Sequence, residues 1–367
     1  MSIIEPVLIE PGASQQVAPY LAEKGYQRVS LAADSHTFEV IGQSLRQSIE
    51  SIGSNVCVTI IKPDNQGDVI ADEASIVQLL LDLRQNSAEV VLAAGSGTLH
   101  DISRFAAYSV GIPFISVPTA PSVDGFNSIG APLIIRGEKK TIQAIGPSAI
   151  FADLDILTKA PDSMIAAGFG DMLGKYTSLF DWKFGSLSGG EPYSAEVADR
   201  TRDALQQCVD NCDEIAKRSP MGIEILTRAL IESGFAMLQF GQSHPASGAE
   251  HHLSHYWEME FMRTGRKQIL HGAKVGVACA EITRLYHRLA KDSPELFPRE
   301  YRDALLNEIS RIPEEVTIKE LLRKVGGPNT PRALNVSDEL LARSLKEAHH
   351  IRPNRHTLLR KYNEINV

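Results

Sequence analysis

The sequence predicts an α/β domain over residues 1–158 followed by an all-α domain over residues 159–367, with the active site in the cleft between them. Short β-branched runs alternate with helical patterns over the first 150 residues, as in βαβ units built around a parallel sheet. From residue 161 onward the apolar residues follow the period of about 3.6 that is typical of helices. A chain of 367 residues also exceeds what one apolar core usually supports, which favours two domains.

Strands and helices are expected to alternate in the first half. Strand patterns cover residues 26–34, 55–62, 88–97 and 111–121, and helical patterns cover residues 37–53 and 73–86. A further stretch at 128–157 is rich in strand-forming residues and would complete the sheet near Leu157. In a sheet of this kind a ligand binds beside the carboxyl ends of the strands, so the cleft is expected there.

Helical patterns dominate the second half. The clearest cover residues 194–218 and 222–240, and the breaks between patterns are the turn-forming sequences GGEP, SHPASG and GGPNTPR. No period of about 20 to 50 residues repeats, so a repeat architecture is not expected.

Charge and cysteine content narrow the class of function. The formal net charge of -8 argues against a nucleic-acid or acidic-membrane partner and favours a small-molecule substrate. The four cysteines have no CxxC spacing, and we expect reduced thiols in a cytoplasmic protein. The amino terminus has no basic segment before its short apolar stretch, and no apolar run is long enough to cross a membrane, so neither export nor membrane insertion is expected.

A glycine-rich turn, Gly95-Ser96-Gly97-Thr98, joins an apolar strand to a helical pattern. Such a Rossmann-like turn suits a dinucleotide, because backbone N–H groups at a helix start can approach the pyrophosphate, although a turn of this type is also often purely structural. Asp34, at the end of an earlier strand, is either a ribose ligand or a helix N-cap. The loop from Pro118 to Ser122 offers hydroxyl groups to the same cleft.

Histidines and acids in the second half suggest a metal site. Asp171 and Lys175 lie one helical turn apart, and this spacing also suits a simple ion pair. His251 and His255 share one helix face, with His252 turned away, and His271 follows in an apolar segment. A histidine at such a helix start is often only a buried core residue, but two imidazoles and a carboxylate would leave a divalent ion open for substrate. The absence of an HExxH pattern argues against a metalloprotease.

Five motifs in order resemble the superfamily of iron-containing alcohol dehydrogenases and dehydroquinate synthase-like enzymes. They are GSGTLHD at 95–101, PTAPSVDG at 118–125, GFGDMLGKYTSLFDW at 168–182, SGAEHHLSH at 247–255 and LHGAKVGV at 270–277. The resemblance covers nearly the whole chain. Within the superfamily the chain is most similar to the bacterial sn-glycerol-1-phosphate dehydrogenases, with the glycerol dehydrogenases next.

The resemblance implies a role for each motif. It implies a divalent metal, Zn²⁺ or Ni²⁺, held by Asp171, His251 and His271. It implies a catalytic role for Asp124, which is expected near the substrate hydroxyls. Lys175, one turn from Asp171, and His255 are further catalytic candidates from their positions and not from the resemblance. The residues expected to bind NAD(P) are Asp34, Gly95, Ser96, Gly97, Thr98, Asp101, Thr119, Ser122 and Ser128.

The implied reaction is hydride transfer between NAD(P) and the carbon that carries the oxygen in sn-glycerol 1-phosphate or dihydroxyacetone phosphate. Asp124 or His255 would relay the proton, and Lys175 would contact the phosphate, with an ion pair to Asp171 or Asp181 as its alternative. Arg266 and Lys267 are further phosphate candidates, although such a pair is usually exposed to solvent. Asp34 would repel a 2′-phosphate, which favours NAD. A homo-oligomer, dimeric or larger, is expected from the resemblance.

Three other functions remain open from the sequence. A glycerol or polyol dehydrogenase would use the same site without a phosphate requirement. A sugar-phosphate cyclase would use NAD only transiently, but such enzymes carry glutamate where this chain has Asp171. A non-catalytic regulator would be expected to lose a member of the set Asp171, His251 and His271, and all three are present.

Overall fold

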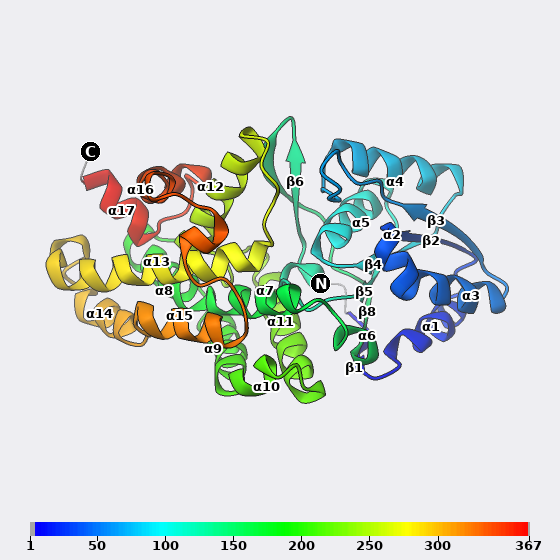
Figure 1. The fold of residues 1–367 in the computed structure, drawn as a ribbon, viewed down its shortest axis with the longest axis horizontal. Helices are drawn as coiled ribbons and strands as arrows, with labels where there is room; N and C mark the ends of the chain where they lie inside the picture. Colours follow the sequence, from blue (N-terminus) through cyan, green and yellow to red (C-terminus); the bar gives the residue numbers. More distant parts are fainter. Residues whose placement is uncertain (1–3, 366–367) are drawn as a thin grey trace.

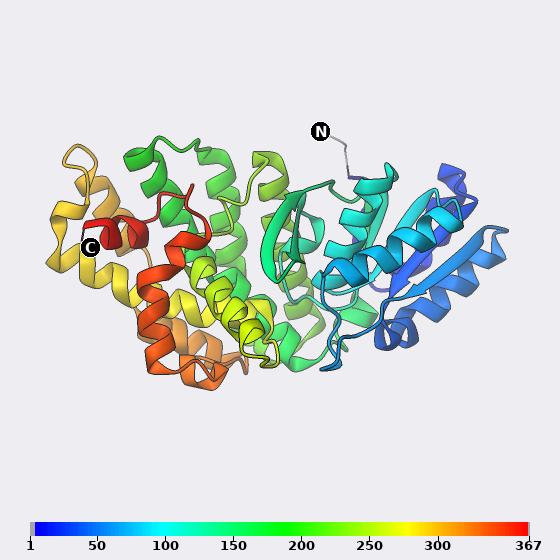
Figure 2. The same ribbon diagram turned by 90° about the horizontal axis from the view of Figure 1, so that it is seen from above.

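The computed structural model describes residues 4–365 and consists of a sheet-containing half and a helical half, arranged side by side along the long axis (Figures 1 and 2). The strands are β1 (Val7–Glu10), β2 (Arg28–Ala33), β3 (Asn55–Ile60), β4 (Val90–Gly95), β5 (Phe114–Pro118), β6 (Gly130–Ile135), β7 (Glu138–Gln143) and β8 (Ala149–Asp153). The helices of the first half are α1 (Val17–Lys24), α2 (Ser35–Thr37), α3 (Gln43–Ser51), α4 (Glu73–Gln85), α5 (Gly97–Val110) and α6 (Leu154–Leu157).

The helices of the second half are α7 (Asp162–Leu173), α8 (Lys175–Gly189), α9 (Ala195–Asp210), α10 (Cys212–Ala216), α11 (Pro220–Phe240), α12 (Ala249–Arg263), α13 (His271–Asp292), α14 (Arg302–Ser310), α15 (Glu315–Lys324), α16 (Asp338–Glu347) and α17 (Leu358–Ile365). Short 3-10 or π turns are η1 (Ala13–Gln16), η2 (Phe38–Gly42), η3 (Gly125–Asn127), η4 (Pro294–Leu296), η5 (Pro331–Leu334) and η6 (Ala348–Ile351). The predicted class, an α/β half followed by a helical half, is confirmed. The predicted boundary at residue 158 falls between α6 and α7 and stays a prediction.

The main sheet has six strands in the order β1-β8-β5-β4-β2-β3, and every neighbouring pair is parallel. The chain passes outward from β2 to β3 and then returns to the other side of β2 as β4. Such a reversal leaves a crevice at the carboxyl ends of the two strands, which is where ligands bind in sheets of this kind. Asp34 follows β2, and the turn at Ser96 follows β4.

Alternating side chains of the strands supply both faces of the sheet. On one face Leu31 and Leu92 pack with α1 and α3, and on the other Ala32 and Val91 pack with α4 and α5. Strands β2 and β4 are mostly apolar because both faces are covered, which is typical of parallel sheets.

Residues 128–157 do not all join the main sheet, and this part of the sequence-based prediction is wrong. Only β8 enters it, whereas β6 and β7 form a separate antiparallel hairpin. The turn residues Arg136 and Gly137 both have positive φ, as a two-residue hairpin turn requires. The hairpin stands beside α12 of the helical half (Figure 1). The edge strand β1 was not predicted.

Helix α13 forms the centre of the helical half and packs against α7, α12 and α15. Its contact with α7 is very close, because glycines meet there: a Cβ added to Gly272 would lie 1.9 Å from the carbonyl oxygen of Ala167, and one added to Gly170 would lie 2.5 Å from that of Gly272. This contact brings the start of α13 against the end of α7.

All four cysteines are free, which agrees with the reduced thiols expected from the sequence. Between residues 4 and 365, no helix has both the length and the apolar character needed to cross a membrane.

Candidate active site

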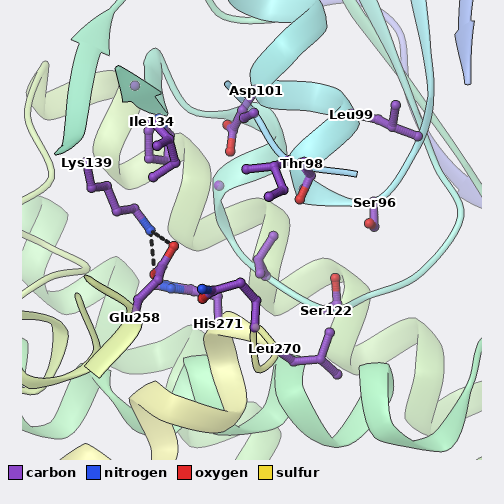
Figure 3. A pocket seen from close by; sticks show the side chains of 18 of the residues that line it. Ser96, Thr98, Leu99, Asp101, Ser122, Ile134, Lys139, Glu258, Leu270 and His271 are labelled. Atoms are coloured by element: carbon purple, nitrogen blue, oxygen red, sulfur yellow. Dashed lines mark hydrogen bonds and ion pairs between the residues drawn. The ribbon is translucent and has the colours of Figure 1, made fainter. Parts of the chain in front are cut away.

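A cavity of about 580 Å³ lies between the carboxyl edge of the sheet and helices α12 and α13. Ser96, Thr98 and Asp101 line it from the first half, and Glu258 and His271 line it from the second (Figure 3). The cavity occupies the cleft that the sequence predicted.

Asp171, His251 and His271 meet at the helical wall of this cavity, from α7, α12 and α13 respectively. One potential ligand atom from each lies within 4.8 Å of the other two. The Nε2 atoms of His251 and His271 lie 3.7 and 4.0 Å from Oδ1 of Asp171. The geometry therefore brings together the three residues predicted to hold a metal.

The donor set fits a divalent cation. Oδ2 of Asp171 accepts a hydrogen bond from the backbone N–H of Asp124, but Oδ1, although buried, has no hydrogen-bond partner. Burial and the nearby charge of Asp124 raise the pKa of Asp171 to about 7, and burial lowers the pKa of both imidazoles well below the usual value. A divalent cation binds neutral imidazoles and carboxylate oxygens, so these three side chains have the chemistry of a metal site.

Glu250 supports this cluster from behind and was not predicted from the sequence. Its Oε1 lies 2.7 Å from Nδ1 of His251, and the same carboxylate accepts hydrogen bonds from Thr177 and the N–H of Gly248. A carboxylate on Nδ1 leaves Nε2 free to bind a metal. The only sequence signal is the adjacent pair in AEHH, which is too common to identify such a role.

Lys175 connects the metal cluster to Asp124. Its Nζ lies 2.7 Å from Oδ2 of Asp124 and 3.6 Å from Oδ1 of Asp171, and Ser233 donates a hydrogen bond to the same oxygen of Asp124. Burial alone would lower the pKa of Lys175, but the two carboxylates outweigh it and raise that pKa to about 12. Asp124 lines the cavity, whereas Lys175 is fully buried behind it. Lys175 thus forms the ion pair with Asp171 that the sequence left as an alternative, and a shorter one with Asp124 that it did not predict, while its phosphate contact stays a prediction.

His255 lines the cavity beside the cluster, and its ring centre lies 5.7 Å from that of His271 and 6.0 Å from that of His251. Burial lowers its pKa well below the usual value, so the imidazole is neutral. His252 is fully buried and outside the lining, in keeping with its position about 100° around the helix.

The glycine-rich turn lies across the cavity from the metal cluster. Ser96 is the N-cap of α5 without a side-chain hydrogen bond, so the first N–H groups of α5 have no cap from it. Gly97 and Thr98 line the cavity, and a Cβ on Gly97 would lie 2.7 Å from Val123. An uncapped helix start facing a cavity fits a pyrophosphate.

The other residues predicted for the cofactor differ in position. Asp34 caps α2 through a hydrogen bond from the N–H of Thr37 and also lines the cavity; the N-cap is observed, and ribose binding stays a prediction. Asp101, Ser122 and Ser128 line the cavity as well. Gly95 and Thr119 are not among the lining residues; they support the turn from behind, where the N–H of Thr119 donates to the carbonyl of Gly95.

Arg104 holds the loop that carries Asp124 and was not predicted. Its guanidinium pairs with Asp101 and donates to the carbonyl oxygens of Gly125 and Gly130. Burial raises the pKa of Asp101 to about 7, against the opposing effect of Arg104.

Several charged lining residues were also missed. Glu258 of α12 accepts hydrogen bonds from Lys139 of β7, and this contact joins the hairpin to the helical half (Figure 3). Lys274 of α13 donates to the same carboxylate. Arg352, close to the carboxyl end, lines the cavity too. These residues come from segments far apart in the sequence, and no short motif groups them. Arg266 and Lys267, the other phosphate candidates, are not lining residues; they contact Asn335 and Asp68.

The family model described as iron-containing alcohol dehydrogenase matches residues 8–161. The chain is 48% identical to a glycerol-1-phosphate dehydrogenase (NAD(P)+) of Geobacillus stearothermophilus, over 99% of this chain and 93% of the relative. It is 42% identical to the protein of that name from Bacillus subtilis (strain 168), over 98% of this chain and 91% of the relative.

Solved structures with the same fold include a probable glycerol dehydrogenase from Sinorhizobium meliloti 1021, with a TM-score of 0.70 and 16% identity, covering 96% of this chain and 90% of that one. Maleylacetate reductase from Rhizobium sp. strain MTP-10005 gives a TM-score of 0.69 and 15% identity, covering 99% and 96%. At these identities the likeness extends to the fold alone.

Proposed function

The chain belongs to the glycerol-1-phosphate dehydrogenases, within the superfamily of iron-containing alcohol dehydrogenases, and from this premise we propose how its cavity interconverts dihydroxyacetone phosphate and sn-glycerol 1-phosphate. The protein is an NAD(P)-dependent oxidoreductase. One observation carries the proposal for the site: one wall of the cavity has an uncapped helix start, and at the other lie two imidazoles beside an oxygen of Asp171 that accepts no hydrogen bond.

In this proposal Asp171, His251 and His271 would hold a divalent ion, Zn²⁺ or Ni²⁺, which would serve as a Lewis acid for the substrate oxygen. Both metals accept imidazole and carboxylate ligands. NAD(P) supplies or accepts the hydride. Glu250 fixes the ring of His251, which keeps Nε2 directed at the ion.

Asp124 orients the substrate. Lys175 and Ser233 hold its carboxylate, and its coupling to Lys175 keeps the pKa of Asp124 below the usual value despite burial. An anionic carboxylate at the cavity wall accepts hydrogen bonds from substrate hydroxyls. His255, neutral and facing the same space, exchanges the proton of the reacting hydroxyl through a ring nitrogen.

The cofactor lies against the first half in this proposal. The free N–H groups at the start of α5 bind its pyrophosphate, with Ser96, Gly97 and Thr98 around it. Asp34 accepts from the adenosine ribose and repels a 2′-phosphate, which favours NAD over NADP. Asp101, Ser122 and Ser128 complete the lining, and Gly95 and Thr119 maintain the turn.

The protein is further proposed to act in the cytoplasm as a homo-oligomer, dimeric or larger, on a small molecule alone. The net charge of -8 supports the absence of a nucleic-acid or acidic-membrane partner.

The test is NADH oxidation by purified, metal-reconstituted protein, with dihydroxyacetone phosphate and dihydroxyacetone in parallel. We expect strong preference for the phosphorylated ketone, loss of activity with a chelator, and loss in His271→Ala. Equal turnover of dihydroxyacetone would show a polyol dehydrogenase instead. Activity that survives both the chelator and His271→Ala would contradict the metal site. Reconstitution with Zn²⁺ or Ni²⁺ separately identifies the active ion.

A further inference from the structure

Arg352 is a cation of the cavity wall that the mechanism above does not use. It follows η6 in the last part of the chain and lines the cavity together with Ser243 and Ser247. Its Nη1 donates to the hydroxyl oxygens of both serines, at 3.0 and 2.9 Å. The guanidinium is therefore held in one orientation at the cavity wall.

The other cations around the cavity already have carboxylate partners. Lys139 and Lys274 pair with Glu258, and Lys175 pairs with Asp124 and Asp171. Among the ion pairs of residues 4–365, none joins Arg352 to a carboxylate. Arg352 is half-buried, and a guanidinium partly withdrawn from water without an anionic partner is costly; an anionic ligand removes that cost.

We propose that Arg352, with the hydroxyl groups of Ser243 and Ser247, binds the phosphate monoester of the substrate and so determines preference for a phosphorylated over an unphosphorylated ketone. This inference rests on the function proposed above for the same cavity. A planar guanidinium can donate two parallel hydrogen bonds to phosphate oxygens, and the serines supply further polar contacts.

The subsite lies close to the reacting end of the cavity. Ser247 directly precedes Gly248, the N-cap of α12, and the N–H of His251 donates to the carbonyl of Gly248. The serine bound to Arg352 is thus within one turn of a proposed metal ligand. Arg355 donates to the carbonyl oxygen of Ser247 at 2.8 Å, so two arginines of the same segment fix this serine.

Phosphate groups of the cofactor are the other possible source of the same chemistry. The start of α5 and Asp34 line the cavity from the sheet half, whereas Arg352 comes from the helical half. We therefore assign Arg352 to the substrate. If it bound a cofactor phosphate instead, its loss would change the KM for NADH or NADPH.

The kinetic test compares Arg352→Gln with the wild-type enzyme. We expect the KM for dihydroxyacetone phosphate to rise roughly 10- to 150-fold, as for a lost hydrogen bond to a charged group, while the KM for NADH stays within about twofold. Activity on dihydroxyacetone should be retained, and Arg352→Lys, which keeps the charge, should recover part of the loss. Arg263→Gln, at an exposed position of α12, is the matched control.

A shift confined to the KM for NADH or NADPH would overturn the assignment to substrate. So would Lys139→Gln reproducing the loss of phosphate preference while Arg352→Gln does not. Equal metal content and circular dichroism of the variants establish that they fold, and Arg352→Lys supplies a second folded variant.

A binding measurement separates this inference from the proposed function. Inorganic phosphate is titrated into the metal-loaded protein with saturating NAD⁺ present, and the shift in Tm is recorded. We expect a phosphate-dependent rise in wild type that is lost in Arg352→Gln. If wild type fails to reduce dihydroxyacetone phosphate but shows this difference, the proposed function fails and the subsite stands. If wild type reduces that substrate and Arg352→Gln behaves like it in both measurements, the subsite is wrong.

Discussion

The neighbouring carboxyl groups of Asp124 and Asp171 have pKa values that are shifted in opposite directions. Lys175, at 2.7 Å, keeps the pKa of Asp124 below its usual value despite burial. Burial and the charge of Asp124 raise the pKa of Asp171 to about 7, and Lys175, at 3.6 Å, opposes this only in part. Without another cation Asp171 competes poorly for the single ammonium group. A divalent ion beside Oδ1 of Asp171, which accepts no hydrogen bond, would favour the ionised form, so that metal binding would be tied to release of a proton.

Glu250 should control metal affinity without contacting the metal. In Glu250→Gln the acceptor on Nδ1 of His251 loses its charge, and we expect metal to bind about 10- to 100-fold more weakly. Competition with a chromophoric chelator measures this affinity. Glu260→Gln, on the same helix but paired with surface arginines, is the control. Equal affinities in all three proteins would contradict the positioning role.

At the scale of elements, the contact between α7 and α13 determines how far apart the proposed metal ligands lie. Asp171 is near the end of α7, and His271 is the first residue of α13. Glycines let the two backbones approach until a Cβ on Gly272 would lie 1.9 Å from a carbonyl oxygen. A larger residue at position 272 would have to push the helices apart, because it would meet a backbone carbonyl group, which cannot move aside as the end of a flexible side chain can.

Gly272→Ala should therefore lower both stability and metal affinity. Overpacking of this kind costs about 1–3 kcal/mol, and the separation of His271 from Asp171 should weaken metal binding. Urea unfolding and chelator competition measure the two effects. The control is Arg288→Ala, at an exposed position of α13, which should change stability by less than about 0.5 kcal/mol. Wild-type metal affinity in Gly272→Ala would refute the role assigned to this contact.

Arg104 links α5 to the loop that carries Asp124, and its removal should change both the stability of the protein and substrate binding. Arg104→Met leaves Asp101 and the carbonyl groups of Gly125 and Gly130 without their partner. We expect a loss of about 3–5 kcal/mol in the free energy of unfolding, as for a broken buried ion pair. The KM for dihydroxyacetone phosphate should rise as well. Arg84→Met, at an exposed position of α4, is the comparison; equal unfolding curves would disprove the link.

At the scale of the whole molecule, the proposed metal ligands connect three helices of the helical half. An ion that binds only the folded state adds about 2.7 kcal/mol when its concentration is one hundred times Kd. Chelation should therefore lower the Tm of wild type, and the drop should disappear in His271→Ala. An identical drop in the variant would mean that the chelated ion is bound elsewhere.

Buried histidines make the molecule sensitive to acid. Burial lowers the pKa of His100 and of His244 from 6.5 to about 3, with nearby arginines adding to the effect. The unfolded chain therefore binds more protons than the folded one, so stability is full above about pH 6.5 and falls as the pH drops towards 3.

Urea unfolding of metal-free protein at several pH values in this window measures the slope. His100→Gln, which can keep a hydrogen bond to Ser116, should reduce the slope by up to one proton. Substitution of the exposed His36 by Gln is the matched comparison. An unchanged slope in His100→Gln would rule out this source of acid sensitivity.

Local patterns in the sequence determined much of this protein. The alternation of apolar runs and helical periods predicted the sheet, its glycine-rich turn and the helical half. The ordered motifs around Asp171, His251 and His271 predicted the residues that the fold brings within 4.8 Å of one another. The alternation depends on residues close in the chain, where propensity and spacing act directly. The set of three ligands spans distant segments and came from the resemblance of the ordered motifs.

Tertiary structure alone decided the rest. Whether residues 130–143 join the main sheet or form a hairpin depends on which backbone is available to pair with them. Lys175, expected to contact the substrate, is a buried partner of Asp124, because the fold brings the loop that carries Asp124 within 2.7 Å of it. Arg352 reached the cavity from near the carboxyl end of the chain. Each outcome depends on contacts between segments that are distant in the sequence. Such contacts form only in the folded chain, so no local pattern predicts their free energy.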